Sequence, residues 1–332
     1  MAGESSLTLT YQGLLTSTLL GYLDSNKFFD NVADATPLLA FLMGGDRIRF
    51  QNGGQNITVA IMHELNTTAK SYSNYDILDT TAQEGFTRAI YDWKQYSVSI
   101  AINGNELTSN MGDAELFNLL DAKAEQAEIS LADKLSTDLY TDGTGNSSKE
   151  LGGLAVMNDP SPTASTYASI NRANNTAWRN GFTTSVGAAA SNLLSNLRTQ
   201  YNNAAQGKAG MGSKPDGIFT TQTVHEAFEA LMFPFLQYQG NATSDNSVNA
   251  GLSNLRYKNA SVEWDADCPS GEMHILNSKH AFLVVHPDRN MAMADGGFQK
   301  PVDQDALVTQ ILAKLEFATN ANSKISGLSG IT

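Results

Sequence analysis

Only one cysteine, Cys268, occurs in the 332 residues of this chain. A single thiol can form neither a disulfide within the chain nor a cysteine-based metal cluster. The sequence also lacks any run approaching the ~20 apolar residues that a membrane helix needs, and its first residues carry no basic segment typical of a secretory signal. We therefore expect a protein without a membrane segment, large enough to be stabilised by its packed interior alone.

Basic residues are scarce. Lysine and arginine number 21 against 34 aspartates and glutamates, which gives a formal net charge of −13. Nucleic-acid binding is driven mainly by Lys and Arg side chains that neutralise phosphates. A chain this acidic, without a basic stripe or tail, is a poor candidate for holding DNA or RNA.

Motifs for metal-dependent or phosphate chemistry are missing as well. His225-Glu226 begins like a zinc-hydrolase motif, but Glu229 stands where the second histidine is needed. Asp265 and Asp267 lie in no ligand-rich loop, so a turn at the end of a strand is the better interpretation. The glycine-rich stretch 143–148 follows a predicted helix and lacks the lysine of a phosphate-binding loop.

Nucleophilic chemistry has no better support. Cys268 has no neighbouring histidine or basic residue in the sequence. Three histidines recur at a spacing of six, and only folding could bring them together: His274, His280 and His286. We therefore predict no catalytic site, no metal site and no cofactor.

Alternating apolar residues predict a long β-hairpin. Ile48 and Phe50 begin one limb, and alternation returns in "AIYDWKQYSVSIAINGNEL" as the second limb. Polar residues dominate between them, from 66 to 83, so we expect a polar tip. A limb of residues 47–63 would span about 55 Å at ~3.3 Å per residue. Since an isolated two-stranded hairpin is marginal in water, this one needs a partner.

A long amphipathic helix is predicted from about 113 to 142, with Asp113 as its N-cap and Gly143 as its terminator. One stripe of it is apolar, and it carries eight acids against two lysines. The acids indicate a solvated face or a face turned toward something that must not bind. The stripe consists of Leu116, Leu120, Ala124, Ala127, Leu131, Leu135 and Leu139.

The rest of the chain mixes short strands and helices without a regular βαβ alternation. Helices are expected over "AAASNLLSNLRTQYNNAAQ" and from near Thr221, and strands over "PDGIFTT", "ASVEWDAD", "GEMHILN", "HAFLVVH" and "QDALVTQILAKLEFATNA". The order of elements indicates the α+β class.

One polar segment, "SINRANNTAWRN", contains an unexpected tryptophan. Trp178 stands there with Arg172 and Arg179, a composition typical of interface hot spots. The same residues could instead anchor the loop to its own chain, with the indole beneath the loop and an arginine capping a helix. Both alternatives stay open at this point.

The order of these features resembles the major capsid protein of tailed bacteriophages, which has the Hong Kong 97-like fold. The similarity runs from about Gly44 to Thr319. One part of it is "YDWKQYSVSIAINGNEL" followed by "AELFNLLDAKAEQAEISLADKLSTDLYTDGTG". The other parts are "LGGLAVM" with Tyr167, Arg172 and "WRN", and the segment "DGIFTTQTVHEAFEALM".

The resemblance implies four parts. They are an N-terminal arm over 1–44, an extended E-loop over 45–105, a peripheral domain over 106–181 and 295–332 that contains the spine helix, and an axial domain over 182–294. Candidate intersubunit or loop-anchoring residues are Trp178, Arg172, Arg179, Trp93, Arg47, Arg49 and Lys70. Lys70 is the only lysine near the predicted tip, which leaves a covalent crosslink open but unsupported. No fused, cleaved scaffold is expected.

The implied function is structural: self-assembly into hexamers and pentamers of an icosahedral head that encloses double-stranded DNA without reading its sequence. The implied partners are copies of the chain, a portal protein, a separate scaffolding protein and, as an option, decoration or cement proteins. Two alternatives remain, an encapsulin-like nanocompartment shell and, from another class, a soluble hydrolase with a histidine–acid site.

Overall fold

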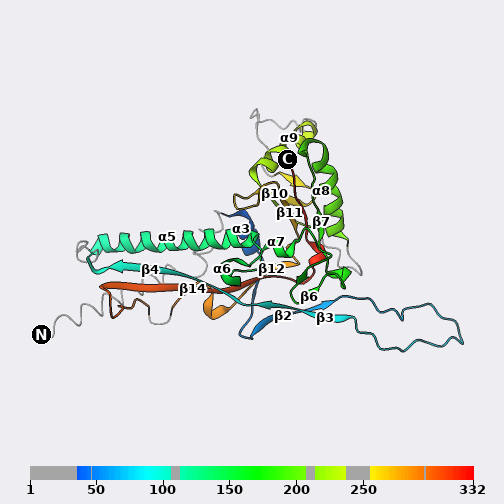
Figure 1. Cartoon of the computed structure of the whole chain (residues 1–332), viewed down its shortest axis with the longest axis horizontal. Helices are drawn as coiled ribbons and strands as arrows, with labels where there is room; N and C mark the ends of the chain where they lie inside the picture. The colour runs from blue at the N-terminus through cyan, green and yellow to red at the C-terminus, as the bar shows by residue number, and fades with distance from the viewer. Residues whose placement is uncertain (1–35, 46, 106–112, 207–213, 237–254, 295–296) are drawn as a thin grey trace, which may run out of the picture.

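The computed structural model describes residues 36–45, 47–105, 113–206, 214–236, 255–294 and 297–332 (Figure 1). The predictions for residues 1–35, and for the side chains of Asp113, Leu116 and Leu120, lie outside this part. The helices are α3 (Pro37–Met43), α5 (Asp113–Tyr140), α6 (Gly145–Ser148), α7 (Leu154–Met157), α8 (Ala189–Ala205) and α9 (Gln222–Leu236), with 3-10 turns η1 (Thr176–Trp178), η2 (Pro287–Arg289) and η3 (Asn322–Lys324).

The described strands fall into two larger sheets and two small hairpins. They are β1 (Ile48–Phe50), β2 (Asn56–Met62), β3 (Phe86–Asp92), β4 (Lys94–Asn103), β5 (Thr166–Tyr167), β6 (Ile170–Asn171), β7 (Gly181–Thr183), β8 (Gly217–Thr220), β9 (Arg256–Tyr257), β10 (Ala260–Trp264), β11 (Met273–Leu276), β12 (Ala281–Val285), β13 (Ala292–Met293), β14 (Ala306–Thr319) and β15 (Ser326–Leu328). Helices and strands mix without regular alternation, which confirms the α+β class.

One sheet has the order β1-β12-β14-β13, with β4 also paired to β14. β4 and β14 pair antiparallel over ten residues, from Lys94↔Leu315 to Asn103↔Ala306. The long helix α5 runs along these two strands (Figure 1). Its apolar stripe is buried at Ala124, Ala127, Leu131, Leu135 and Leu139, as predicted. We call the five-stranded sheet with α5 the peripheral unit.

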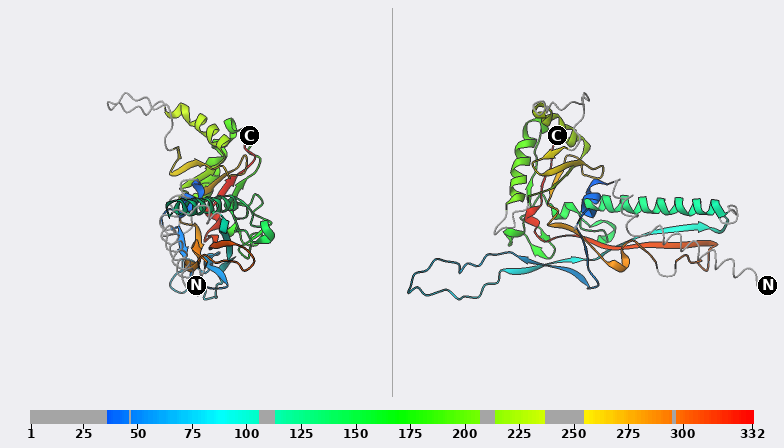
Figure 2. Two further views of the ribbon diagram at one scale, coloured as in Figure 1. Left: turned by 90° about the vertical axis from the view of Figure 1, so that its left-hand side faces the viewer. Right: turned by 180° about the vertical axis from the view of Figure 1, so that it is seen from behind.

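The second sheet has the order β7-β15-β11-β8-β10-β9 and packs against α8 and α9. This axial unit rises from the end of the elongated peripheral unit at which α5 ends, on the side of the hairpin β2–β3 (Figures 1 and 2). It has a hydrophobic core of its own, built from residues such as Leu193, Ile218, Phe228, Val262 and Ile275. The helices and strands predicted for this part of the sequence are confirmed.

Strand pairing departs from the expected boundaries in two places. β12 and β13 pair with β14 in the peripheral unit, although the expected axial domain included them. β15 follows β14 in sequence but pairs with β7 and β11 in the axial unit. The chain therefore crosses between the two units more often than the sequence indicated.

The hairpin is shorter than predicted. Only β2 and β3 form it, in the register Asn56↔Asp92 to Met62↔Phe86. β4 leaves the hairpin after Trp93 and joins β14, and β1 pairs with β12. Both strands alternate apolar and polar residues as a hairpin limb does, but alternation does not identify the partner strand.

Candidate functional site

The end of the hairpin, residues 63–85, projects from the body of the protein (Figure 1). We call this segment the distal hairpin. It contains no strand, and side chains link its limbs: Thr67 donates to Gln83 at 2.8 Å, and Lys70 Nζ donates to the carbonyl of Ile77 at 3.1 Å. Every residue from 71 to 84 is exposed. The segment therefore has almost no packing against its own chain.

The tip is mostly polar, as predicted, but exposed apolar side chains lie within it and beside it. Seven of the eleven large apolar side chains that are exposed in the described residues lie between 62 and 86, with Tyr75 wholly exposed and Ile77 at 90%. Four carboxylates against one lysine also make residues 63–85 acidic. The apolar set is Met62, Leu65, Tyr72, Tyr75, Ile77, Leu78 and Phe86. Abundant Asn, Ser and Thr between these residues concealed them in the sequence.

Buried aromatic residues fix the base of the hairpin to the peripheral unit. The Tyr91 hydroxyl donates to the carbonyl of Thr319 at 2.7 Å. The Tyr96 hydroxyl donates to Asp138 Oδ2 at 2.8 Å and accepts from the Leu151 amide at 2.9 Å. The inner face of β2–β3 is buried. The direction of the arm is thus set by its own chain, whereas the distal hairpin is left without a partner.

A buried carboxyl group lies near this base. Glu316 Oε1 accepts a hydrogen bond from the Gly152 amide at 2.9 Å, and Oε2 is buried without a partner among the described residues. Burial, chiefly, raises the pKa of Glu316 to about 8. No motif marks Glu316, Tyr91 or Tyr96 in the sequence, because each acts through residues distant along the chain.

Four of the seven candidate residues make contacts within this region or beside it: Trp93, Arg49, Arg47 and Lys70. Trp93 Nε1 donates to the carbonyl of Gly54 at 3.1 Å, and Lys314 Nζ lies 4.9 Å from its ring centroid. The Arg49 guanidinium stacks 3.5 Å from the Phe282 ring centroid. Arg47 stacks on Phe41 and forms an ion pair with Asp216 at 3.6 Å. Lys70 bonds within the distal hairpin, as described above.

Trp178 is only 2% exposed and lies inside its own chain. Its indole stacks on Tyr167, with ring centroids 6.1 Å apart, and donates to the Tyr167 carbonyl at 3.3 Å. The Asn322 side-chain amide donates to the Trp178 carbonyl. This is the geometry of the intrachain alternative.

Arg172 is fully buried beneath the same loop. It donates to the carbonyls of Val156 and Met157, at 2.8 and 3.0 Å, and so caps the C-terminus of α7. It also pairs with Asp159 at 3.3 Å, while burial lowers its pKa. Arg179 donates to the carbonyl of Arg172 at 2.7 Å. The polar segment is therefore an internal anchor built around an arginine.

Two acids of α5 depart from the expected solvated face. Asp138 is buried and accepts from Tyr96 and from Lys134, the latter at 2.7 Å. Glu128 is 4% exposed. Its burial, and to a smaller extent the charge of the neighbouring Glu125, raises its pKa to about 7. Of the acids in the described part of α5, Glu125 and Asp133 remain exposed.

The three equally spaced histidines have separate surroundings. His274 Nδ1 lies 3.0 Å from Asn158 Nδ2, and His280 Nδ1 lies 2.7 Å from Asn320 Oδ1. The His286 ring meets Trp93 edge-on. Two of them also lie beside a carboxylate: His274 Nε2 is 3.3 Å from Glu272 Oε2, and His286 Nδ1 is 3.9 Å from Asp288 Oδ2.

The remaining sequence candidates also have structural roles. Burial raises the pKa of the Cys268 thiol, which disfavours the thiolate. His225 and Glu226 lie on α9, where Glu226 accepts from Gln222, and Glu229 is half-buried on the same helix. Within the described ranges no three His, Cys, Asp or Glu side chains gather as a metal site would require, and no helix there is long and apolar enough to span a bilayer.

Comparison of the sequence with family models and with curated proteins gave no match. The structure, by contrast, matches solved capsid assemblies. A chain of the cyanophage A-1(L) capsid asymmetric unit aligns over 90% of this chain and 93% of its own, with a TM-score of 0.67 and 16% identity. A chain of the satellite phage P4 procapsid aligns over 100% of this chain and 98% of its own, with a TM-score of 0.52 and 10% identity.

A third match is the virus-like particle from Pyrococcus furiosus, which aligns over 96% of this chain and 99% of its own, with a TM-score of 0.51 and 10% identity. The fold is therefore that of shell-forming proteins. More particularly, it is the Hong Kong 97-like fold found in the major capsid proteins of tailed phages, as the sequence resemblance implied.

Proposed function

We propose that this chain is the major capsid protein of a tailed phage, a structural subunit that acts by self-assembly and not as an enzyme. Copies would form pentamers and hexamers of an icosahedral head in the virion. The observation that carries the proposal is the distal hairpin, which projects from the body with exposed apolar side chains while the buried Tyr91 anchors its base.

The exposed apolar side chains need a partner. Soluble monomers rarely expose apolar patches above a few hundred Å². Burying a large apolar side chain contributes roughly 1.5–3 kcal/mol, so seven of them supply on the order of 10 kcal/mol before the entropic cost of association. Most of this burial free energy would be gained when a neighbouring copy covers the distal hairpin.

Geometry favours rings. The arm projects away from the body, so its contact site on the neighbour differs from the arm itself. Such a head-to-tail contact generates closed rings when the rotation between copies closes. Pentamers and hexamers are rings of this kind.

The parts of the subunit follow its sheets in this proposal. The E-loop is the hairpin of residues 56–92, the peripheral domain is the five-stranded sheet with α5, and the axial domain is the six-stranded sheet with α8 and α9. The N-terminal arm of residues 1–44 stays a proposal. Of this range the structure describes residues 36–44, which include α3.

The charge of the chain suits enclosure of double-stranded DNA better than binding to it. With a net charge of −13, the subunit has little capacity to neutralise phosphates. The exposed acids of α5, such as Glu125 and Asp133, would line a wall that does not trap the genome if that face is turned inward. A portal protein, a separate scaffold and cement proteins are further proposed partners.

A nanocompartment shell is the second candidate, favoured by the match to the Pyrococcus furiosus particle. The cargo separates the two. Purified shells that contain double-stranded DNA support the phage head, and shells that contain a protein cargo support the compartment.

The test compares the wild type with Tyr75→Ser/Ile77→Ser by sedimentation velocity and negative-stain microscopy. Val302→Ser is the matched control, because Val302 is wholly exposed but lies away from the hairpin. We expect rings or shells from the wild type and the control, and folded monomers from the double variant. Assembly of the double variant to the wild-type extent would contradict the role given to the hairpin.

A further inference from the structure

The short helix α3 lies between the peripheral and axial units. Leu38, Leu39 and Leu42 are buried, and the helix packs against α5 and β12 of the peripheral unit and against β8 of the axial unit. A seven-residue helix is not stable alone in water, so α3 depends on this seat for its structure.

The axial unit binds the start of α3 through Asp265, at the end of β10. Asp265 is 2% exposed, and its Oδ2 accepts from the Leu38 amide at 3.4 Å and from the Tyr140 hydroxyl at 3.1 Å. Leu38 is in α3 and Tyr140 is the last residue of α5. One carboxylate thus links the helix, the peripheral unit and the axial unit.

The neighbouring Asp267 strengthens the link to α5. Its carboxylate accepts hydrogen bonds from the hydroxyls of Ser136 and Thr137. The turn 265–267 therefore binds the last two turns of α5 and the first turn of α3 together.

The other end of α3 is held by Phe41 and Arg47. The Phe41 ring meets Phe219 of β8 edge-on, with centroids 5.2 Å apart. A Cβ on Gly217 would lie 2.8 Å from the Phe41 ring, so only glycine leaves room for this contact. The Arg47 guanidinium stacks 3.9 Å from the centroid of the Phe41 ring and pairs with Asp216 of the axial unit.

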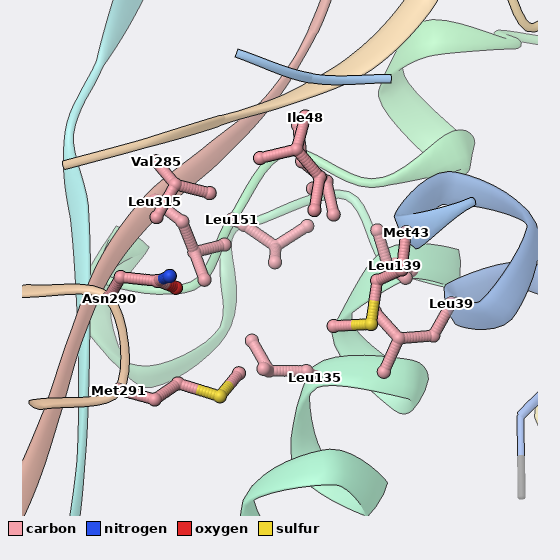
Figure 3. Close-up of a pocket in the computed structure, with 11 residues that line it drawn as sticks. Leu39, Met43, Ile48, Leu135, Leu139, Leu151, Val285, Asn290, Met291 and Leu315 are labelled. Atoms are coloured by element: carbon pink, nitrogen blue, oxygen red, sulfur yellow. The ribbon is translucent and has the colours of Figure 1, made fainter. Parts of the chain in front are cut away.

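The packing beneath α3 is incomplete. A dry apolar cavity of about 20 Å³ lies between α3, α5, β12 and β14, with Leu39 and Met43 of α3 at its edge (Figure 3). Gly45, in the left-handed conformation with φ of 69°, follows the helix and provides a pivot. A short helix over a cavity, next to a glycine pivot, is suited to leaving its seat.

We propose that α3 is a conformational lock between the two units. When it is seated, Asp265 holds α3, α5 and the axial turn in one arrangement. When it leaves, the axial unit loses its contacts with Leu38 and Phe41 and can shift against α5, to which the turn 265–267 still binds. The lock consists of contacts within one chain, so it holds whether or not the proposed assembly function is correct.

Hydrogen exchange read by mass spectrometry tests the lock in the full chain. Tyr140→Phe removes one hydrogen bond to Asp265 without touching α3. A hydrogen bond to a charged group contributes ~1.5–3 kcal/mol, so the amides of α3 should exchange at least about tenfold faster. Tyr91→Phe is the matched control, because it removes a buried tyrosine hydroxyl that bonds to the backbone of Thr319, away from α3.

Unchanged exchange of α3 in Tyr140→Phe would overturn the proposal. So would an equal rise in both variants, because that result reflects general loss of stability and not a link between Asp265 and α3.

The reciprocal variant is Phe41→Ala, which removes the ring that contacts Phe219 on β8. Amides 137–140 at the end of α5 should then exchange several-fold faster. Phe228→Ala is a matched truncation in the axial core. It should leave the exchange rates of amides 137–140 unchanged relative to the rest of α5. Faster exchange confined to α3 itself would show that the helix opens without releasing α5, and would overturn the lock.

Discussion

Glu316→Gln should stabilise the subunit, although it replaces a buried, hydrogen-bonded side chain. Glutamine has the same shape and keeps an oxygen that can accept from the Gly152 amide. The difference is that glutamine does not titrate. A carboxyl whose pKa is raised from 4.5 to about 8 holds its proton in the folded chain but loses it on unfolding at neutral pH.

Proton linkage determines the sign and size of the effect of Glu316 on stability. The contribution of protonated Glu316 is complete below pH 4.5 and declines as pH rises toward 8, at ~1.36 kcal/mol per pH unit. Between pH 4.5 and 7 the loss is about 3 kcal/mol for the wild type and nothing for the variant. For a chain of this length that corresponds to a Tm higher by about 4 °C at pH 7.

The assay is thermal and urea unfolding of free subunits at pH 5, 7 and 8. The advantage of Glu316→Gln should grow with pH, while Glu84→Gln, at an exposed site, controls for loss of one carboxylate. An advantage that stays constant with pH, or a variant less stable than the wild type at pH 8, would refute the account of Glu316.

Two further changes test the loop around Trp178. Arg172→Met should destabilise the subunit by about 3–5 kcal/mol in urea unfolding, because it leaves the two carbonyls at the end of α7 without their donor and removes the cation beside the half-buried Asp159. Arg179→Met, at a partly exposed site, should lose about 1 kcal/mol, and equal losses would contradict the central role of Arg172. Ser169→Gly should stabilise by ~1 kcal/mol, because Ala168 and Ser169 form a two-residue turn in which both φ angles are positive. Ser161→Gly, at a loop position without positive φ, should give no such gain.

The sequence predicted the elements better than their partners. The apolar stripe of α5 and the strands β10 and β14 were recognisable because burial on one face imposes a period. The strands β8, β11 and β12 are buried at every residue and were recognisable as short, largely apolar runs between turns. β4 was assigned to the hairpin because alternation shows that one face is covered, and not which strand lies beside it. The pairing with β14 connects residues more than 200 positions apart.

The candidate site was predicted less completely. Trp178 and Arg172 stood out as unusual, but their burial depends on the carbonyls at the end of α7, which no local pattern reveals. Asp138 was counted with the acids of α5, and its burial follows from the hydroxyl of Tyr96 on β4. The apolar side chains of the distal hairpin were overlooked because they lack any regular spacing.

A density map of the assembled particle from cryo-electron microscopy tests the central claim most directly. We expect closed rings of five and six subunits in which residues 63–85 of each copy lie against its neighbour and Tyr75 and Ile77 are covered. A particle in which the distal hairpin remains in solvent, or a chain that forms no particle with or without a scaffold, would contradict it.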